Sequence, residues 1–144
     1  MPYHMDWYIE KQILMVHLHG DFTVEDYVQY FQDCYAAYNA SEGHKVHIIA
    51  DSSFVTHNPN LLELRRHVPK GTHTNEGWVL NVISGPSSRL FRFVLNTISN
   101  ASQKQIRHMN SIPQAIEFLR DMDSTLNWDL ARPEVLEMPI PVNA

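Results

Sequence analysis

Two histidines and an aspartate at short spacing could form a metal-binding site. His17 and His19 are separated by one residue, and Asp21 follows two positions later. Side chains at i and i+2 of a strand point to the same face, so the two imidazoles could share an ion. His47 belongs to the next predicted parallel strand and could face them. One hypothesis is therefore a metal-dependent hydrolase. Three further residues could complete its ligand set: His44, Asp51 and His57.

The alternative interpretation is that His17 and His19 are polar residues on the more open face of a sheet. Two histidines at this spacing form a short pattern that occurs often by chance. Phe22 follows Asp21, where the fuller metallohydrolase pattern has a histidine. We therefore expect no bound metal and no other cofactor.

A second candidate site lies in a turn that precedes an apolar helix. The turn contains Ser87, Ser88 and Arg89. Two hydroxyls, a guanidinium and the free N–H groups of a helix start are suited to a phosphate or a carboxylate. The pattern predicts a small anionic ligand or a lipid headgroup there, unless the serines only cap the helix.

The same helix is a candidate interface. It is apolar on more than one face, which is typical of a helix that is deeply buried or faces a partner. Aromatic side chains beside arginine are enriched where protein surfaces pair. We expect a homodimer, and ordinary core packing is the alternative. The candidate interface residues are Leu90, Phe91, Phe93 and Val94.

Cys34 lies in the apolar stripe of another helix, the one that follows residue 23, and is expected to be a buried structural thiol.

The elements that must position these residues alternate along the chain. Thr23 is a good N-cap with Asp26 as its capping-box partner, and Ser111 can cap a last helix that contains Pro113. The predicted strands are 7–9, 13–19, 46–50, 78–83 and 106–109, and the predicted helices follow residues 23, 60, 88 and 111. Residues 51–60 and 69–77 are rich in turn formers and are predicted to be loops.

This alternation predicts an α/β fold. The expected architecture is a four- to five-stranded, mostly parallel sheet with an N-terminal antiparallel hairpin and four covering helices. Residues 1–126 would form a single domain. Residues 127–144 are rich in proline and would be a tail that docks on the domain or on a neighbouring subunit.

Charge and composition limit the partners. The formal net charge is -5, which argues against nucleic acid as the main partner. No apolar run approaches the roughly 20 residues that span a bilayer. One cysteine cannot form an internal disulfide, and the N-terminus lacks the pattern of a signal peptide, so we expect a cytoplasmic protein.

The order of elements resembles the STAS domain, a family related to anti-sigma-factor antagonists. The resemblance spans about residues 5 to 122 and rests on three segments: residues 18–23 entering a helix, residues 46–51 as a core strand, and residues 110–119 as the closing helix. It implies a non-catalytic regulatory module that binds a protein partner or a small ligand. Some members are switched by phosphorylation of a serine, but here residues 56–60 contain neither that serine nor its glycine.

Overall fold

The structure is a computed structural model, and it describes residues 2–67, 75–83 and 105–139. Its centre is a five-stranded mixed sheet in the order β1-β2-β3-β4-β5. The strands are β1 (Tyr3–Ile9), β2 (Ile13–Asp21), β3 (Val46–His57), β4 (Glu76–Val82) and β5 (Ile106–Met109). β1 pairs with β2 in an antiparallel hairpin, and the other three pairings are parallel. The prediction of an α/β fold with such a hairpin is confirmed.

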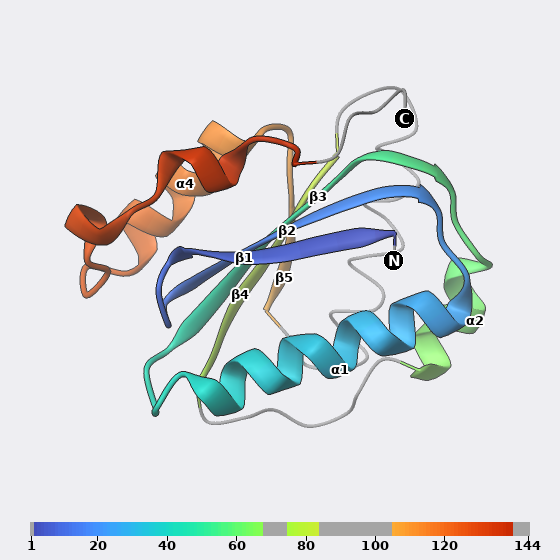
Figure 1. Ribbon diagram of the computed structural model, residues 1–144, viewed down its shortest axis with the longest axis horizontal. Helices are drawn as coiled ribbons and strands as arrows, with labels where there is room; N and C mark the ends of the chain where they lie inside the picture. Colours follow the sequence, from blue (N-terminus) through green and yellow to red (C-terminus); the bar gives the residue numbers. More distant parts are fainter. Residues whose placement is uncertain (1, 68–74, 84–104, 140–144) are drawn as a thin grey trace.

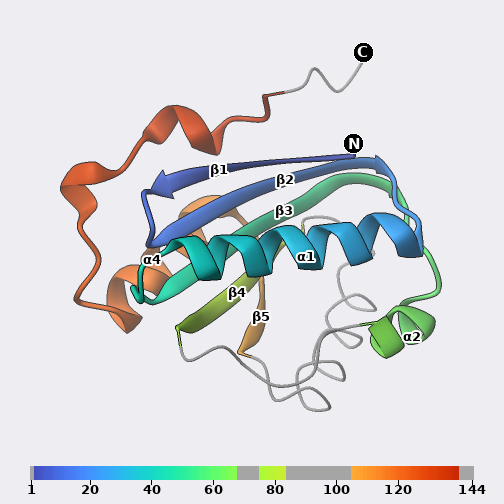
Figure 2. The same ribbon diagram turned by 60° about the horizontal axis from the view of Figure 1, so that its bottom comes forward.

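In the described part of the chain, two helices of more than two turns cover opposite faces of this sheet (Figures 1 and 2). On one face, α1 (Val24–Ala40) packs its tyrosines and Cys34 against Leu14, Val16 and Ile48. On the other, α4 (Ile112–Met122) buries Ala115 and Leu119. We call these the α1 face and the α4 face.

The helix starts follow the predicted caps. The Thr23 side chain accepts a hydrogen bond from the Asp26 amide, and the Asp26 carboxylate accepts one from the Thr23 amide, which completes a capping box. Ser111 caps α4 in the same way through the Gln114 amide, and Pro113 lies in the first turn. These caps satisfy backbone donors that have no partner inside the helix.

The prediction of four helices is not borne out in the described part of the chain. Between β3 and β4, α2 (Leu61–Leu64) is a single turn that continues as the 3₁₀ turn η1 (Arg65–His67). Leu64 is buried beside α1, but Arg66 and His67 are exposed and provide no apolar face that would extend the helix. The helix predicted to follow residue 88 lies outside the described residues.

β3 is longer than predicted. Residues 51–57 were expected to form a loop because they are rich in turn formers, but they continue the strand. They do so because β2 also continues, through Gly20 and Asp21, and supplies partners as far as His57. Register shifts after His17 and after Gly20 accommodate the irregular sequence, and Gly20 adopts a left-handed conformation there.

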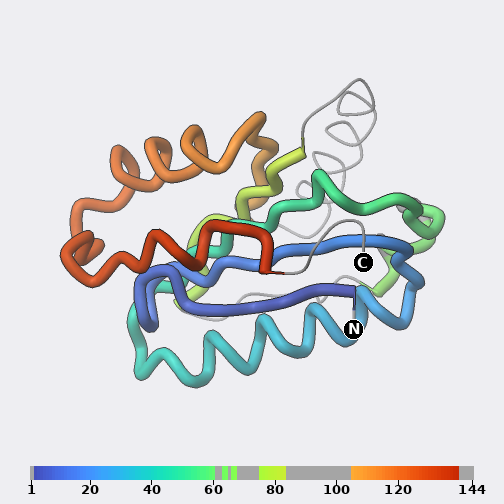
Figure 3. Tube along the Cα trace, turned by 45° about the horizontal axis from the view of Figure 1, so that its top comes forward, coloured from blue at the N-terminus to red at the C-terminus, as the bar shows by residue number. Residues whose placement is uncertain are grey.

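The described part of the tail lies on the α4 face of the same chain. Two 3₁₀ turns, η2 (Trp128–Leu130) and η3 (Pro133–Leu136), run beside β1 and β2 on the side away from α1 (Figure 3). The Arg132 amide donates to the Tyr8 carbonyl at 2.9 Å, and Val135 is buried in the core of this face. Among the described residues, no helix is long and apolar enough to cross a membrane.

Candidate functional site

Two buried histidines lie on the α4 face at different levels of the sheet, His47 near the start of β3 and His17 in the middle of β2. His47 begins β3 and pairs in register with Ile13, whereas His17 is four residues further along β2 and pairs with Asp51. Each is only 1% exposed. At a strand rise of about 3.3 Å per residue, the two histidines are about 13 Å apart. That separation prevents them from binding one ion, because ligand nitrogens lie about 2 Å from a metal.

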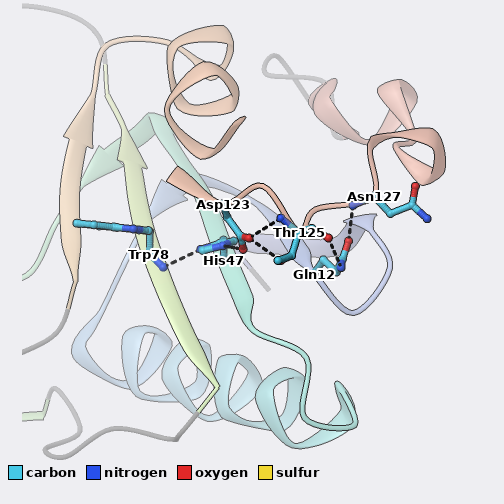
Figure 4. A network of polar contacts seen from close by, with 6 residues as sticks. All are labelled: Gln12, His47, Trp78, Asp123, Thr125 and Asn127. Atoms are coloured by element: carbon cyan, nitrogen blue, oxygen red, sulfur yellow. Dashed lines mark hydrogen bonds and ion pairs between the residues drawn. The ribbon is translucent and has the colours of Figure 1, made fainter. Parts of the chain in front are cut away.

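His47 has a partner for each ring nitrogen (Figure 4). Its Nδ1 accepts a hydrogen bond from the Trp78 backbone N–H at 2.9 Å, and its Nε2 lies 2.8 Å from Oδ2 of Asp123. A nitrogen that accepts from an N–H carries no proton, so Nε2–H must donate to the carboxylate and the ring is neutral. Burial lowers the pKa of His47, although Asp123 opposes that shift, which is consistent with a neutral ring.

The Asp123 carboxylate is held in turn by Thr125, which follows the end of α4. Its Oδ1 accepts from the Thr125 amide at 2.9 Å and from the Thr125 hydroxyl at 2.5 Å. Gln12 extends the network, because its Nε2 donates to the Thr125 carbonyl at 3.5 Å and its Oε1 accepts from the Asn127 amide at 2.9 Å. Figure 4 shows these residues side by side at the end of the β1–β2 hairpin. This network connects β3, β4 and the segment that follows α4. Both ring nitrogens of His47 are engaged and none is free for proton transfer, so the network stabilises the fold.

His17 is held differently. Its Nε2 lies 2.9 Å from the Val135 carbonyl oxygen in η3, and its Nδ1 is buried with no hydrogen-bond partner among the described residues. Nε2 of His19 is also buried and has no partner there. A buried polar atom without a partner costs about 1–3 kcal/mol, and most such atoms in native proteins are paired. The alternative interpretation placed His17 on the more open face of the sheet. That interpretation is wrong for His17, because η3 covers it.

The register places His17 in a row of polar residues across the α4 face. His4 of β1 pairs with His17, and His17 pairs with Asp51. Neighbouring strands lie about 4.8 Å apart, so the side chains of one row are adjacent. Asp51 is buried and His4 is exposed. We call His4, His17 and Asp51, together with His19, the histidine row.

The structure does not bring the residues of the sequence-based metal hypothesis together, because Asp51 lies beside His17 whereas Asp21 pairs with His57. Asp21 is exposed and accepts hydrogen bonds from Thr56 and His57, each at 2.7 Å. Those bonds, that of Thr56 first, lower the pKa of the Asp21 carboxyl. Within the described ranges, no group of three or more histidine, cysteine, aspartate or glutamate side chains is placed to hold a metal ion.

Cys34 is a buried thiol, as predicted. Burial raises its pKa to about 12, so it is protonated at neutral pH and is not a nucleophile. The remaining predicted site residues lie outside the described residues: Ser87, Ser88, Arg89, Leu90, Phe91, Phe93 and Val94.

Sequence reasoning missed Asp123, considered Val135 only as a residue that could dock the tail, and considered Asp51 only as a further metal ligand. Strand alternation places Asp51 on the same face as His47, but only the register between β2 and β3 places it beside His17. No local pattern connects His47 with Asp123, which is 76 residues away. No model of a known protein family matches this chain, and a search of curated proteins finds no match either.

Proposed function

We propose that this protein is a non-catalytic binding module whose small-ligand site is the histidine row. The site would lie in the middle of β2 and β3, at the level where the neighbouring parallel strands β4 and β5 end at Val82 and Met109, with η3 over His17. Ligands of α/β proteins commonly bind near the carboxyl ends of parallel strands. The mixed sheet and its N-terminal hairpin are compatible with the resemblance to STAS domains, which supports the proposal at the level of fold alone.

The observation that supports a ligand at this site is the pair of unpartnered nitrogens. Nδ1 of His17 and Nε2 of His19 are both buried and have no hydrogen-bond partner in the described part of the chain. His47, on the same face, has both nitrogens satisfied by the protein. A ligand that supplies the missing partners would remove a cost of about 1–3 kcal/mol per nitrogen.

The chemistry of the described residues favours binding over catalysis. The Cys34 thiol is protonated and buried, and both nitrogens of His47 are engaged. A metal-dependent hydrolase is the less favoured alternative, since His17 and His47 cannot share an ion and Asp21 pairs with His57. An anion or lipid site at Ser87, Ser88 and Arg89 also stays a prediction, as do the homodimer, the protein partner and the cytoplasmic location.

The test compares ligand-induced stabilisation of matched variants. A library of small polar compounds is screened by thermal unfolding with the wild-type chain, His17→Phe and His57→Ala. His17→Phe keeps a ring but removes the nitrogens, and His57 is exposed and remote in register from His17. We expect at least one compound to raise the Tm of the wild type and of His57→Ala but not of His17→Phe.

Two results would contradict the proposal. If the stabilising compounds act equally on His17→Phe, the ligand site lies elsewhere. If mass spectrometry shows that the protein chemically converts a stabilising compound, the module is a catalyst.

A further inference from the structure

The hydrogen-bonding state of His17 limits what its ligand can be. The Val135 carbonyl oxygen can only accept, so the 2.9 Å contact requires a proton on Nε2 of His17. In the neutral ring, Nδ1 is then an acceptor with a free lone pair. A group that satisfies it must bring an N–H or O–H donor. This requirement on the ligand rests on the proposed function, which places a ligand site at His17.

Asp51 supplies the charge of the site. It is 6% exposed and lies beside His17 in register. The Ser53 amide donates to its Oδ1 at 3.0 Å, which fixes the carboxylate but leaves it capacity to accept further bonds. A buried carboxylate favours a cationic partner over a neutral or an anionic one.

Among the described residues, no lysine or arginine occupies that position in the row. The residues in register across the sheet at this level are His4, His17, Asp51, Val82 and Met109, which include neither lysine nor arginine. In the covering tail, Arg132 is engaged by Asp6, Trp7 and Glu134. The row therefore offers a carboxylate and an acceptor nitrogen to a cation from outside the described chain.

We infer that the histidine row binds a protonated amine, whose N–H groups donate to Nδ1 of His17 and whose charge lies against Asp51. Nε2 of His19 is a second buried nitrogen that can accept from the same ammonium group when its ring carries the proton on Nδ1. An organic ammonium fits better than a metal ion, because no group of three metal-binding side chains is placed together among the described residues.

The experiment uses three probes of equal length: ethylammonium, acetamide and acetate. Each is titrated at constant ionic strength and neutral pH into the full-length wild-type chain, whose histidine ring nitrogens are followed by long-range ¹H–¹⁵N NMR. We expect ethylammonium to shift the Nδ1 resonance of His17 saturably, acetamide to bind at least about tenfold more weakly, and acetate to cause no saturable shift. A tenfold difference corresponds to about 1.4 kcal/mol.

Asp51→Asn tests the role of the carboxylate, with Asp21→Asn as the matched control. We expect Asp51→Asn to weaken ethylammonium binding at least about tenfold, while Asp21→Asn leaves it unchanged, because Asp21 is exposed and pairs with His57. The comparison of probes on the wild type stands even if Asp51→Asn fails to fold.

Several outcomes would overturn the inference and leave the proposed function in place. A stronger response to acetate than to ethylammonium would make the row an anion site, and a stronger response to acetamide would show that the charge of Asp51 does not select the ligand. The absence of any response to ethylammonium, while another compound stabilises the wild type but not His17→Phe, would also exclude an amine. If no compound distinguishes the wild type from His17→Phe, the proposed function itself fails.

Discussion

His47 and His17 are both buried histidines on one face, but their nitrogens differ in what they contact. The Trp78 amide and the Asp123 carboxylate engage both nitrogens of His47. Among the described residues, His17 has one hydrogen-bond partner, the Val135 carbonyl. Loss of His47 would leave the part-buried Trp78 amide and Oδ2 of Asp123 without this partner. Loss of His17 would leave only the Val135 carbonyl without it and would remove a nitrogen that has no partner among the described residues.

The two histidines should therefore respond differently to the same substitution. We expect His47→Leu to lower the free energy of unfolding by about 3 kcal/mol, since two part-buried polar atoms each lose a hydrogen-bond partner at a cost of about 1–3 kcal/mol. His17→Leu should cost about 1 kcal/mol or less. Urea unfolding of both variants measures the difference, and equal losses would contradict this account.

Gly77 is required because His47 approaches it closely. A Cβ at this position would lie 2.3 Å from Nδ1 of His47 and 2.7 Å from the Val46 carbonyl oxygen. Gly77→Ala should destabilise the fold by about 3 kcal/mol, because neither the buried ring nor the backbone can move freely. Gly43→Ala is the control: its φ is +87° with open space around it, so its cost should be about 1 kcal/mol. A smaller loss at Gly77 than at Gly43, by chemical unfolding, would be inconsistent with the close approach.

His47 should also make stability depend on pH. Burial lowers its pKa from the ordinary value of 6.5, so the unfolded chain binds a proton more readily than the folded one. The contribution of the neutral ring is complete above pH 6.5 and is lost as the pH falls from there through the lowered pKa of the folded state. Asp123 makes a separate contribution to stability that is lost only at lower pH. Burial raises the pKa of its carboxyl, but hydrogen bonds from Thr125 and His47 outweigh burial and hold the pKa below the ordinary value of 3.8.

The measurement is the free energy of unfolding of the wild type and of His47→Gln on both sides of pH 6.5. We expect the stability gap between them to narrow as the solution becomes more acidic. A gap that stays constant or widens on acidification would show that His47 is not held neutral in the fold.

At the scale of elements, the tail forms part of the α4 face. The Trp128 ring stacks edge-on against Tyr8, and the Arg120 guanidinium lies 4.1 Å from the centre of that ring. Together with the backbone contacts of Arg132 and Val135, these contacts of the Trp128 ring anchor η2 and η3 above the hairpin. The cover over His17 therefore depends on contacts made several residues earlier in the chain.

Trp128→Ala should loosen this cover. We expect a loss of about 2–3 kcal/mol, less than for a fully buried tryptophan because the ring is half-buried. Leu130→Ala, in the same 3₁₀ turn but 54% exposed, should change stability by less than about 0.5 kcal/mol. The Val135 amide should also exchange hydrogen faster in Trp128→Ala. Unchanged exchange there would indicate that Trp128 does not anchor the tail.

Local signals predicted the elements where the information lies within a few residues. The capping box from Thr23 to Asp26 and the serine cap with Pro113 define the starts of α1 and α4. The extension of β3 from Asp51 to His57 was not predictable, because turn-forming residues were stabilised as a strand by partners on β2 that are distant in sequence. Local propensity is overridden where a neighbouring strand supplies hydrogen bonds.

At the scale of the whole molecule, the candidate site arises from register and packing. Alternation along β2 predicts that His17 points away from Leu14 and Val16, and the structure places it so. That Asp51 lies beside it, and that Val135 covers it, depends on the pairing of β2 with β3 and on the path of a proline-rich tail. Neither the strand pairing nor the path of the tail can be read from the spacing of residues. The sequence pattern therefore predicted a site made of His17, Asp21 and His47 instead.

The most direct test of the central claim is the protonation pattern of the His17 ring. Long-range ¹H–¹⁵N NMR of the purified protein without added ligand distinguishes a protonated ring nitrogen from an unprotonated one. We predict a proton on Nε2, which faces Val135, and an unprotonated Nδ1 without the shift that accompanies a hydrogen bond. A proton on Nδ1, or an Nδ1 already engaged by a partner within the chain, would contradict a ligand site at His17.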